Sequence, residues 1–160
     1  MENPQLDQPS RLLEAGIVNA KFGTQVTVVA PVNIYGCEIG DSVFVGPFVE
    51  IQKDVSIGAR TKIQSHAFIC ELVTIGSDCF IGHGVMFVND LFQSGGPARG
   101  DKSKWMSTTI GNHVSIGSNA TILPVCICDH VVIGAGAVVT KNIVSPGIYA
   151  GNPARLLRKL

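Results

Sequence analysis

The stretch "IGARTKIQSHAFICELVTIGSDCFIG", residues 57–82, places an isoleucine at every sixth position: Ile57, Ile63, Ile69, Ile75 and Ile81. A period of six fits neither an α-helix, with its 3.6 residues per turn, nor a simple strand, with its alternation of two. It fits a short strand followed by a turn, repeated so that three units of six residues close one triangular coil of 18. This stretch therefore predicts an all-β fold of stacked coils, in which parallel strands lie roughly 4.8 Å apart.

The repeat extends over most of the 160 residues. The aliphatic series reaches back to Phe22 and resumes at Ile110 after a break, slipping by one residue between Ile122 and Ile127. A small or β-branched residue usually stands four positions after each aliphatic one, and we expect both to point inward. Glycine often follows the aliphatic residue, where it suits a turn. The pattern predicts one domain with a lead-in at 1–20, repeats at 21–87 and 110–143, a loop at 88–109 and a tail at 144–160.

Composition and charge exclude several classes of protein. Lys and Arg together number 12, as do Asp and Glu, so the formal net charge is zero and no nucleic-acid partner is expected. No apolar run is long enough to span a bilayer, and residues 1–16 lack the apolar core of a secretory signal, so we expect a cytoplasmic location. The five cysteines are expected to be free thiols. Two of them, Cys79 and Cys126, occupy the position predicted to be small and inward.

The 18-residue coil predicts which outward side chains stack on one another. His83 is expected above Ser65, the neighbour of His66, so both histidines lie on one edge of adjacent coils. The next edge carries a second outward column, made of Lys53, Glu71 and Asn89. We expect His113 and His130 to be solvated surface residues.

The break is an insertion at residues 88–109, too long to be a simple turn. Such an insertion in a compact domain is usually functional or disordered. Its regular structure is interrupted by Gly95, Gly96, Pro97 and Gly100. Phe92 and Trp105 would be costly to leave in water, so we expect the loop to pack on a neighbouring subunit; a mobile surface loop is the alternative.

With these repeats the chain resembles the hexapeptide-repeat acyltransferases, whose fold is the left-handed parallel β-helix. The left hand is implied by the resemblance, because the general crossover rule favours the right hand. The motifs "SHAFICE", residues 65–71, and "HGVMFVND", residues 83–90, look more specifically like N-acetyltransferases of nucleotide-linked 3-amino sugars. The nearest type acts on dTDP-3-amino-3,6-dideoxyhexoses for bacterial surface glycans such as lipopolysaccharide.

The resemblance implies roles for the residues at the break. Asn89, in the "ND" pair, would lie near the amino group of the sugar, and Asp90 would hold its hydroxyls or the amine. Glu71 is a second candidate for the amine or the ring. His83 is a candidate general base, since imidazole titrates near neutral pH, although the leaving thiolate of coenzyme A is an alternative proton acceptor. The remaining candidates for substrate binding are the outward residues His66 and Lys53.

The resemblance also implies acetyl-CoA as co-substrate and a homotrimer with its active sites between subunits. Coenzyme A would lie over the coils that follow the loop, where small residues let pantetheine approach the backbone. The tail "GNPAR", residues 151–155, would complete the groove and offer basic groups to the phosphates. The candidate residues are Gly117, Ser118, Ala135, Gly136, Thr140, Lys141, Asn152, Pro153 and Arg155.

Other functions of this fold fit the residues less well. The γ-class carbonic anhydrases need several imidazoles on zinc, but His83 is followed five residues later by Val88, so no metal is expected. A non-catalytic scaffold would not need His, Asn and Asp grouped at the loop. Among acyl acceptors, a UDP-linked 3-amino uronic acid, a 4-amino sugar and a sugar hydroxyl stay open, and a hydroxyl would make a base such as His83 far more necessary.

Overall fold

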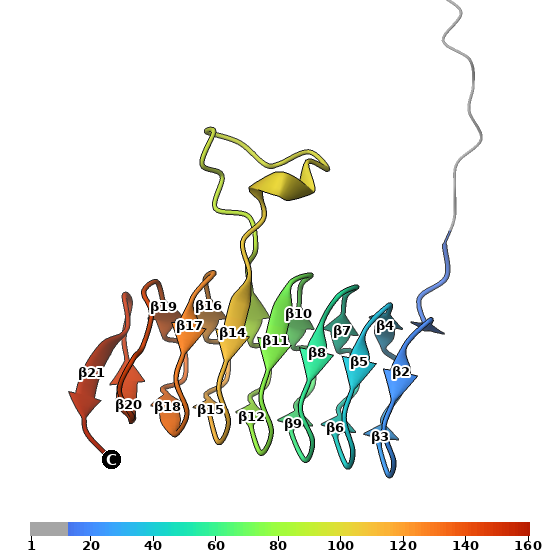
Figure 1. The fold of residues 1–160 in the computed structure, drawn as a ribbon, viewed down its shortest axis with the longest axis horizontal. Helices are drawn as coiled ribbons and strands as arrows, with labels where there is room; N and C mark the ends of the chain where they lie inside the picture. The colour runs from blue at the N-terminus through green and yellow to red at the C-terminus, as the bar shows by residue number, and fades with distance from the viewer. Residues whose placement is uncertain (1–12) are drawn as a thin grey trace, which may run out of the picture.

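The computed structural model describes residues 13–160, which form a triangular prism of short strands with one protruding loop (Figure 1). Residues 1–12 of the predicted lead-in lie outside the described part of the chain. Three sheets, here named A, B and C, make the three faces of the prism. From β1 to β19, successive strands fall on successive sheets, so each coil of this part of the chain adds one strand to every face. The predicted all-β coil is confirmed.

The strands are short, and most have two residues. Sheet A contains β1 (Ile17–Val18), β4 (Asn33–Tyr35), β7 (Glu50–Ile51), β10 (Phe68–Ile69), β13 (Met86–Phe87), β16 (Thr121–Ile122) and β19 (Val138–Val139). Sheet B contains β2 (Lys21–Phe22), β5 (Glu38–Ile39), β8 (Ser56–Ile57), β11 (Val73–Ile75), β14 (Thr108–Ile110) and β17 (Cys126–Ile127). Sheet C contains β3 (Thr27–Val28), β6 (Phe44–Val45), β9 (Lys62–Ile63), β12 (Phe80–Ile81), β15 (Ser115–Ile116), β18 (Val131–Ile133), β20 (Gly147–Ala150) and β21 (Arg155–Arg158).

The hand and register of the coil agree with the expectation from the sequence. In Figure 1 the chain passes from sheet A over the upper edge to sheet B and down to sheet C as it advances from right to left, which is a left-handed path. The strands are parallel, except that β21 runs antiparallel to β20. Ile57 pairs with Ile75, one coil of 18 residues later. Beyond the loop Phe87 pairs with Ile122, so the prism continues in register across the insertion.

The interior is filled by the aliphatic residues of the repeat. Ile51, Ile69 and Ile81 are fully buried, and Phe87, the last core residue before the loop, is 1% exposed. Burying one such side chain contributes about 1.5–3 kcal/mol, and the repeat provides one for nearly every strand. The loop therefore leaves a closely packed frame. No helix in residues 13–160 is long and apolar enough to cross a membrane.

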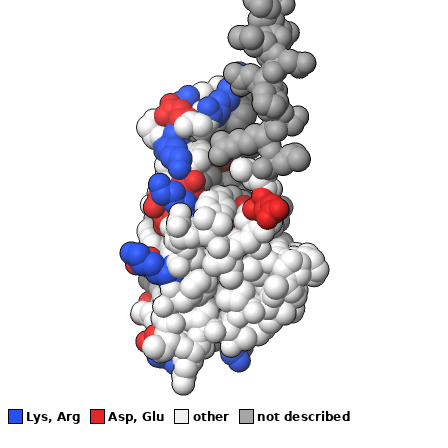
Figure 2. Space-filling model, turned by 90° about the vertical axis from the view of Figure 1, so that its right-hand side faces the viewer, with Lys and Arg blue, Asp and Glu red and all other residues white. Residues whose placement is uncertain are grey.

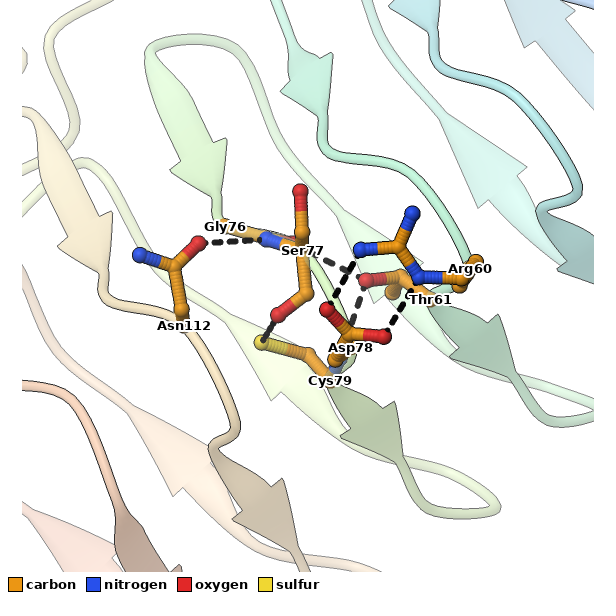
Figure 3. A network of polar contacts seen from close by, with 7 residues as sticks. All are labelled: Arg60, Thr61, Gly76, Ser77, Asp78, Cys79 and Asn112. Atoms are coloured by element: carbon orange, nitrogen blue, oxygen red, sulfur yellow. Dashed lines mark hydrogen bonds and ion pairs between the residues drawn. The ribbon is translucent and has the colours of Figure 1, made fainter.

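The corner between sheets B and C is joined from coil to coil by polar side chains. Arg60 donates two hydrogen bonds of 2.7 Å to the carboxylate of Asp78, one coil further on (Figure 3). The hydrogen bond from Arg60 lowers the pKa of the Asp78 carboxyl group. The backbone N–H of Ser77 donates to Oδ1 of Asn112 in the next coil, at 2.9 Å. These bonds hold the turns of successive coils in register.

Beneath this corner, one buried polar side chain has a hydrogen-bond acceptor and a hydrogen-bond donor for its hydroxyl group. Thr61 is 0% exposed, and its hydroxyl donates to the carbonyl of Gly76 and accepts from the N–H of Cys79 (Figure 3). Cys79 is buried as predicted, and burial raises the pKa of its thiol. The prediction for Cys126 was wrong, because this residue is exposed. The one-residue slip in the repeat places Val125 at the small inward position instead.

Candidate active site

His83 lies at the corner where the chain passes from sheet C to sheet A, in the turn between β12 and β13. Its Nδ1 is 2.8 Å from Oγ of Ser65, the stacking that the 18-residue coil predicts. The ring is exposed, and the carbonyl of His83 accepts a hydrogen bond from the N–H of Asn119 in the next coil. If Nδ1 donates its hydrogen to Ser65, the lone pair of Nε2 is free to accept a proton.

His66 occupies the same corner one coil earlier. It is exposed, has a left-handed backbone with φ of 64°, and its ring centroid lies 4.9 Å from that of Phe48. Phe48, at the same corner of the preceding coil, is 58% exposed. The predicted edge with two histidines is therefore present, and it includes an aromatic ring that the sequence analysis did not single out.

Four of the predicted cofactor residues lie further along this corner. The N–H of Gly136 donates to the carbonyl of Ser118 at 2.8 Å, which joins the two turns. A Cβ atom on Gly117 would lie 2.4 Å from the backbone nitrogen of Ala135, so glycine is required there by the packing of coil on coil. Nothing lies within 4 Å of a Cβ atom built on Gly136, so that turn has an open outer surface. Small residues at this corner thus serve two different purposes.

The second predicted column lies at the corner between sheets A and B. Asn89 follows β13 directly, and its Nδ2 donates to the carbonyl of Glu71 at 3.3 Å, so these two residues stack as predicted. The carbonyl of Asn89 accepts from the N–H of Met106, where the loop returns to the prism. Lys53 lies one coil before Glu71, but its Nζ is directed to Asp54 at 3.9 Å. Asn89 is therefore placed at the base of the loop.

The loop itself covers residues 88–107 and ends two residues earlier than predicted, since β14 begins at Thr108. It projects from the prism beyond the upper edge (Figure 1). Asp90 organises its first half: Oδ1 accepts from the N–H of Phe92 at 2.9 Å and Oδ2 from the N–H of Ala98 at 2.7 Å. Ala98 is only 5% exposed. The predicted contact of Asp90 with substrate hydroxyls or the amine stays a prediction.

The second half of the loop contacts the prism through a lysine. A short 3-10 helix, η1 (Lys102–Lys104), begins after Asp101, whose carboxylate accepts from the N–H of Ser103 at 3.2 Å. Nζ of Lys102 lies 2.5 Å from Oε2 of Glu71 and 5.2 Å from the centroid of the Trp105 ring. The sequence analysis missed this contact, because the loop has no period from which a spatial neighbour can be read.

A cavity of about 430 Å³ lies where the loop meets sheet A. It is lined by Gln52, Phe68, Cys70, Met86, Phe87, Val88, Asn89, Asp90, Phe92 and Trp105. Most of these side chains are apolar, and the polar groups come mainly from the "ND" pair. Nearby, the pKa of Tyr35 is raised by burial and then by the negative charges of Glu50 and Glu71. The cavity thus combines mainly apolar walls with the polar groups of Asn89 and Asp90.

The remaining cofactor candidates gather at the C-terminal end of the prism. Thr140, Lys141 and Arg155 line one cavity of about 260 Å³, which the tail closes. Asn152 and Pro153, joined by a cis peptide bond, form the exposed turn of the tail. The structure does not bring this set next to Gly117 and the other small residues, because Thr140 lies at the A/B corner. The tail crosses between the two sets by bonding to β19, where Ala154 donates to the carbonyl of Val138.

The structure also shows where the residues relevant to a metal-dependent reaction lie. Within residues 13–160, no three His, Cys, Asp or Glu side chains lie close enough together to hold a metal ion. His113 and His130, predicted to be solvated, are exposed at the B/C corner and stack with ring centroids 4.8 Å apart. They lie at a different corner from His83, and Val88 is half-buried in the cavity wall.

The fold and the repeat together define the class of protein. The family model "Bacterial transferase hexapeptide (six repeats)" matches residues 36–71 and 107–141, the two blocks on either side of the loop. These blocks show that the chain carries the hexapeptide repeat that its sequence predicted. The loop falls in the gap between them and is therefore not part of the shared repeat.

Individual relatives point to transferases. The bifunctional protein GlmU of Streptococcus uberis is 33% identical over 125 residues, which are 78% of this chain and 25% of that protein. The chain spans 21–29% of the length of the curated relatives it matches. A hexapeptide-repeat acetyltransferase from Vibrio cholerae, complexed with acetyl coenzyme A, has a TM-score of 0.65 and 26% identity over 78% of this chain and 71% of that one. A perosamine N-acetyltransferase from Caulobacter crescentus, in complex with CoA and GDP-perosamine, shares the fold at 21% identity, with a TM-score of 0.63 over 84% of this chain and 54% of that one.

Proposed function

We propose that this protein transfers an acetyl group from acetyl-CoA to the amino group of a nucleotide-linked amino sugar, with dTDP-3-amino-3,6-dideoxyhexoses as the favoured acceptors. The observation that carries the proposal is the cavity at the foot of the loop. Asn89 lines this cavity and stands directly above Glu71, a carboxylate whose side chain is only 12% exposed. A shielded carboxylate beside an amide suits an acceptor that carries an amine. The related structures that hold acetyl coenzyme A and a nucleotide-linked amino sugar support the same reaction.

The chemistry needs little from the protein beyond placement. The free amine attacks the thioester carbonyl carbon, the carbon–sulfur bond breaks, and coenzyme A leaves as a thiolate. The attacking nitrogen then gives up a proton, either to that thiolate or to Nε2 of a His83 contributed by a neighbouring subunit, because His83 and Asn89 of one chain lie at different corners of the prism. Asn89 offers an amide to position the amine or its neighbouring hydroxyl, and Asp90 keeps the adjacent loop in place. Positioning of two reactants and donors for the developing oxyanion supply most of the rate in such a step.

The proposed site lies between subunits of a homotrimer. Viewed from its N-terminal end, the prism carries its charged side chains mainly along one side and on the loop, while a broad opposite face has few of them (Figure 2). Phe48, Phe80 and Met86 are 58%, 40% and 44% exposed, which is unusual for such large apolar groups unless a partner covers them. This supports packing of one copy on another. The cytoplasmic location expected from the sequence stays a prediction.

Acetyl-CoA is proposed to lie over the coils that follow the loop. Gly117, Ser118, Ala135 and Gly136 would allow the pantetheine arm to approach the backbone. At the end of the prism Lys141 and Arg155 offer exposed cations for its phosphates, with Thr140, Asn152 and Pro153 beside them. The two sets lie at different corners, so the cofactor would have to cross sheet A, or one set would belong to the site of the neighbouring subunit.

Acetylation of a sugar hydroxyl is the second candidate. One observation favours it: His83 is positioned by Ser65 at 2.8 Å, an arrangement that suits a general base. An unprotonated amine needs no such base toward a thioester, whereas a hydroxyl does.

Thiol release from acetyl-CoA tests the proposal. The acceptor panel comprises dTDP-linked 3-amino and 4-amino deoxyhexoses, the UDP-linked 3-amino uronic acid, and the matching sugars with hydroxyls in place of the amines. We expect release with one amino sugar and none with its hydroxyl counterpart. Release only with hydroxyl acceptors would transfer the proposal to O-acetylation, and no release with any acceptor would overturn it.

A further inference from the structure

The ammonium group of Lys102 forms an ion pair with the carboxylate of Glu71, next to the proposed acceptor cavity. Nζ of Lys102 lies 2.5 Å from Oε2 of Glu71. The two partners differ in their surroundings: the side chain of Glu71 is 12% exposed, whereas that of Lys102 is 55% exposed. The carboxylate thus belongs to the rigid frame, and the ammonium reaches it from the loop.

The frame holds Glu71 at its backbone. Its N–H donates to Oε1 of Gln52 at 3.3 Å, and its carbonyl accepts from Nδ2 of Asn89 at 3.3 Å. Its position is therefore set by the coils on both sides. Gln52 also lines the cavity, as does Trp105, so Glu71 lies next to the proposed acceptor site.

The aromatic ring of Trp105 completes the surroundings of the cation. Nζ of Lys102 lies 5.2 Å from the centroid of this ring, within the range of a cation–π contact. A carboxylate and an aromatic face together suit a compact ammonium group. Lys102 therefore shows, within the molecule, that this pair accepts a primary ammonium.

Lys102 is held only loosely. It belongs to η1, a 3-10 helix of three residues with no buried side chain, on a loop that projects from the prism. Only the carboxylate of this ion pair is shielded; the lysine is 55% exposed, so ordering its long side chain and screening by water at that end offset part of the attraction. A second ammonium offered at Glu71 can therefore take its place.

We propose that Glu71 and Trp105 form an ammonium-binding subsite that Lys102 fills in the free protein, and that the ammonium group of the acceptor replaces Lys102 there. The identity of the acceptor rests on the proposed function. The exchange is non-covalent, and the bound ammonium gives up one proton to water before the nitrogen attacks the thioester. Release of Lys102 couples acceptor binding to movement of the loop. A hydroxyl acceptor has no charge with which to displace the lysine, so the subsite selects for amines.

The chain contains a built-in probe for this exchange, since Trp105 is its one tryptophan. The test titrates the protein with 3-amino-3-deoxyglucose, and with glucose as the neutral match, while tryptophan fluorescence is recorded. Lys102→Met removes the competing ammonium and keeps the side-chain length. We expect it to tighten binding of the amino sugar about fivefold and to leave glucose unaffected. Glu71→Gln is expected to weaken binding of the amino sugar about tenfold or more.

Lys104→Met is the matched control. Lys104 lies on the same short helix, but its Nζ is directed to Asp101 at 3.8 Å, away from Glu71. This variant should bind the amino sugar as the wild type does. Thermal melting of all three variants checks that each is folded. Unchanged or weaker binding of the amino sugar by a folded Lys102→Met variant would overturn the proposal and leave the Lys102–Glu71 pair as a structural tie.

The outcome is separable from that of the proposed function. If no amino sugar supports thiol release but Lys102→Met still tightens amine binding, the subsite stands and the proposed reaction fails. If thiol release occurs and Lys102→Met leaves the KM for the amino sugar unchanged, the reaction stands and the exchange at Glu71 fails.

Discussion

Two corners of the same prism use their polar side chains in different ways. At the B/C corner, the side chains of Arg60, Asp78 and Asn112 form hydrogen bonds that join neighbouring coils, and the chain turns without interruption. At the A/B corner the chain departs for residues 88–107, where Asn89 lines a cavity and contacts Glu71 of the preceding coil. The difference indicates that the first corner maintains the register of the coils, whereas the second presents groups to a ligand.

The sharpest way to break this comparison is to remove one asparagine from each corner. We expect Asn89→Ala to lower turnover in the thiol-release assay by about 10²-fold, because it loses an amide that positions the reacting groups, and to leave the melting temperature nearly unchanged. Asn112→Ala, its counterpart at the B/C corner, should show the opposite pattern, with full turnover and reduced stability. Equal turnover in the two variants would remove Asn89 from the site.

The loop tests the comparison on a larger scale. Replacing residues 93–104 by a short glycine linker removes η1 and the bond from Ala98 to Asp90. We expect the KM for the acceptor to rise about tenfold, because Phe92 and Trp105, which line the cavity, lose the segment that holds them in place. Thermal stability should change little, since Ala98 is the one buried residue of the removed segment. A large fall in melting temperature with an unaltered KM would make the loop part of the frame instead.

A substitution in the core beneath the B/C corner should change the free energy of unfolding and leave turnover unaltered. Thr61→Val keeps the shape of the side chain but leaves the N–H of Cys79 without its acceptor. Unfolding by denaturant should reveal a loss of about 1–3 kcal/mol, with turnover unchanged. Ser56→Ala, on the exposed side of β8, is the control and should have almost no effect. A variant at Thr61 that is stable but inactive would contradict the assignment of this corner to the frame.

The smallest expected effect concerns pH. The hydrogen bond from Arg60 lowers the pKa of the Asp78 carboxyl group, so the folded state holds this proton less tightly than the unfolded chain does. Its contribution to stability is therefore present above the ordinary pKa of about 3.9 and is lost as pH falls through the lowered value. Melting curves between pH 2 and 6 should show a steeper acid loss in the wild type than in Asp78→Asn. Identical curves would show that this pair adds nothing to the frame.

The frame was predictable because its period is regular. Isoleucines at every sixth position establish the coil, and the coil in turn places Asn89 above Glu71 and His83 above Ser65. Errors arose where the period changes. Cys126 was expected inside because the slip before Ile127 was not carried through to the small position.

The loop and the cofactor candidates lay beyond this kind of prediction. The contacts of Asp90 with Ala98 and of Lys102 with Glu71 depend on the path of a segment without any repeat. The separation of Thr140 from Ala135 was within reach, because five residues are nearly one hexapeptide and carry the chain to the next corner. The proposed groove also requires a neighbouring copy, and the period of the sequence does not predict how two copies pack together.

The most direct test of the account compares two acceptors that differ in one group. Thiol release from acetyl-CoA is measured with a dTDP-3-amino-3,6-dideoxyhexose and with the dTDP-6-deoxyhexose that carries a hydroxyl in place of the amine. The account predicts rapid release with the amine and none above background with the hydroxyl, together with an acetyl group on nitrogen in the product. Equal release with both acceptors, or release with the hydroxyl alone, would contradict it.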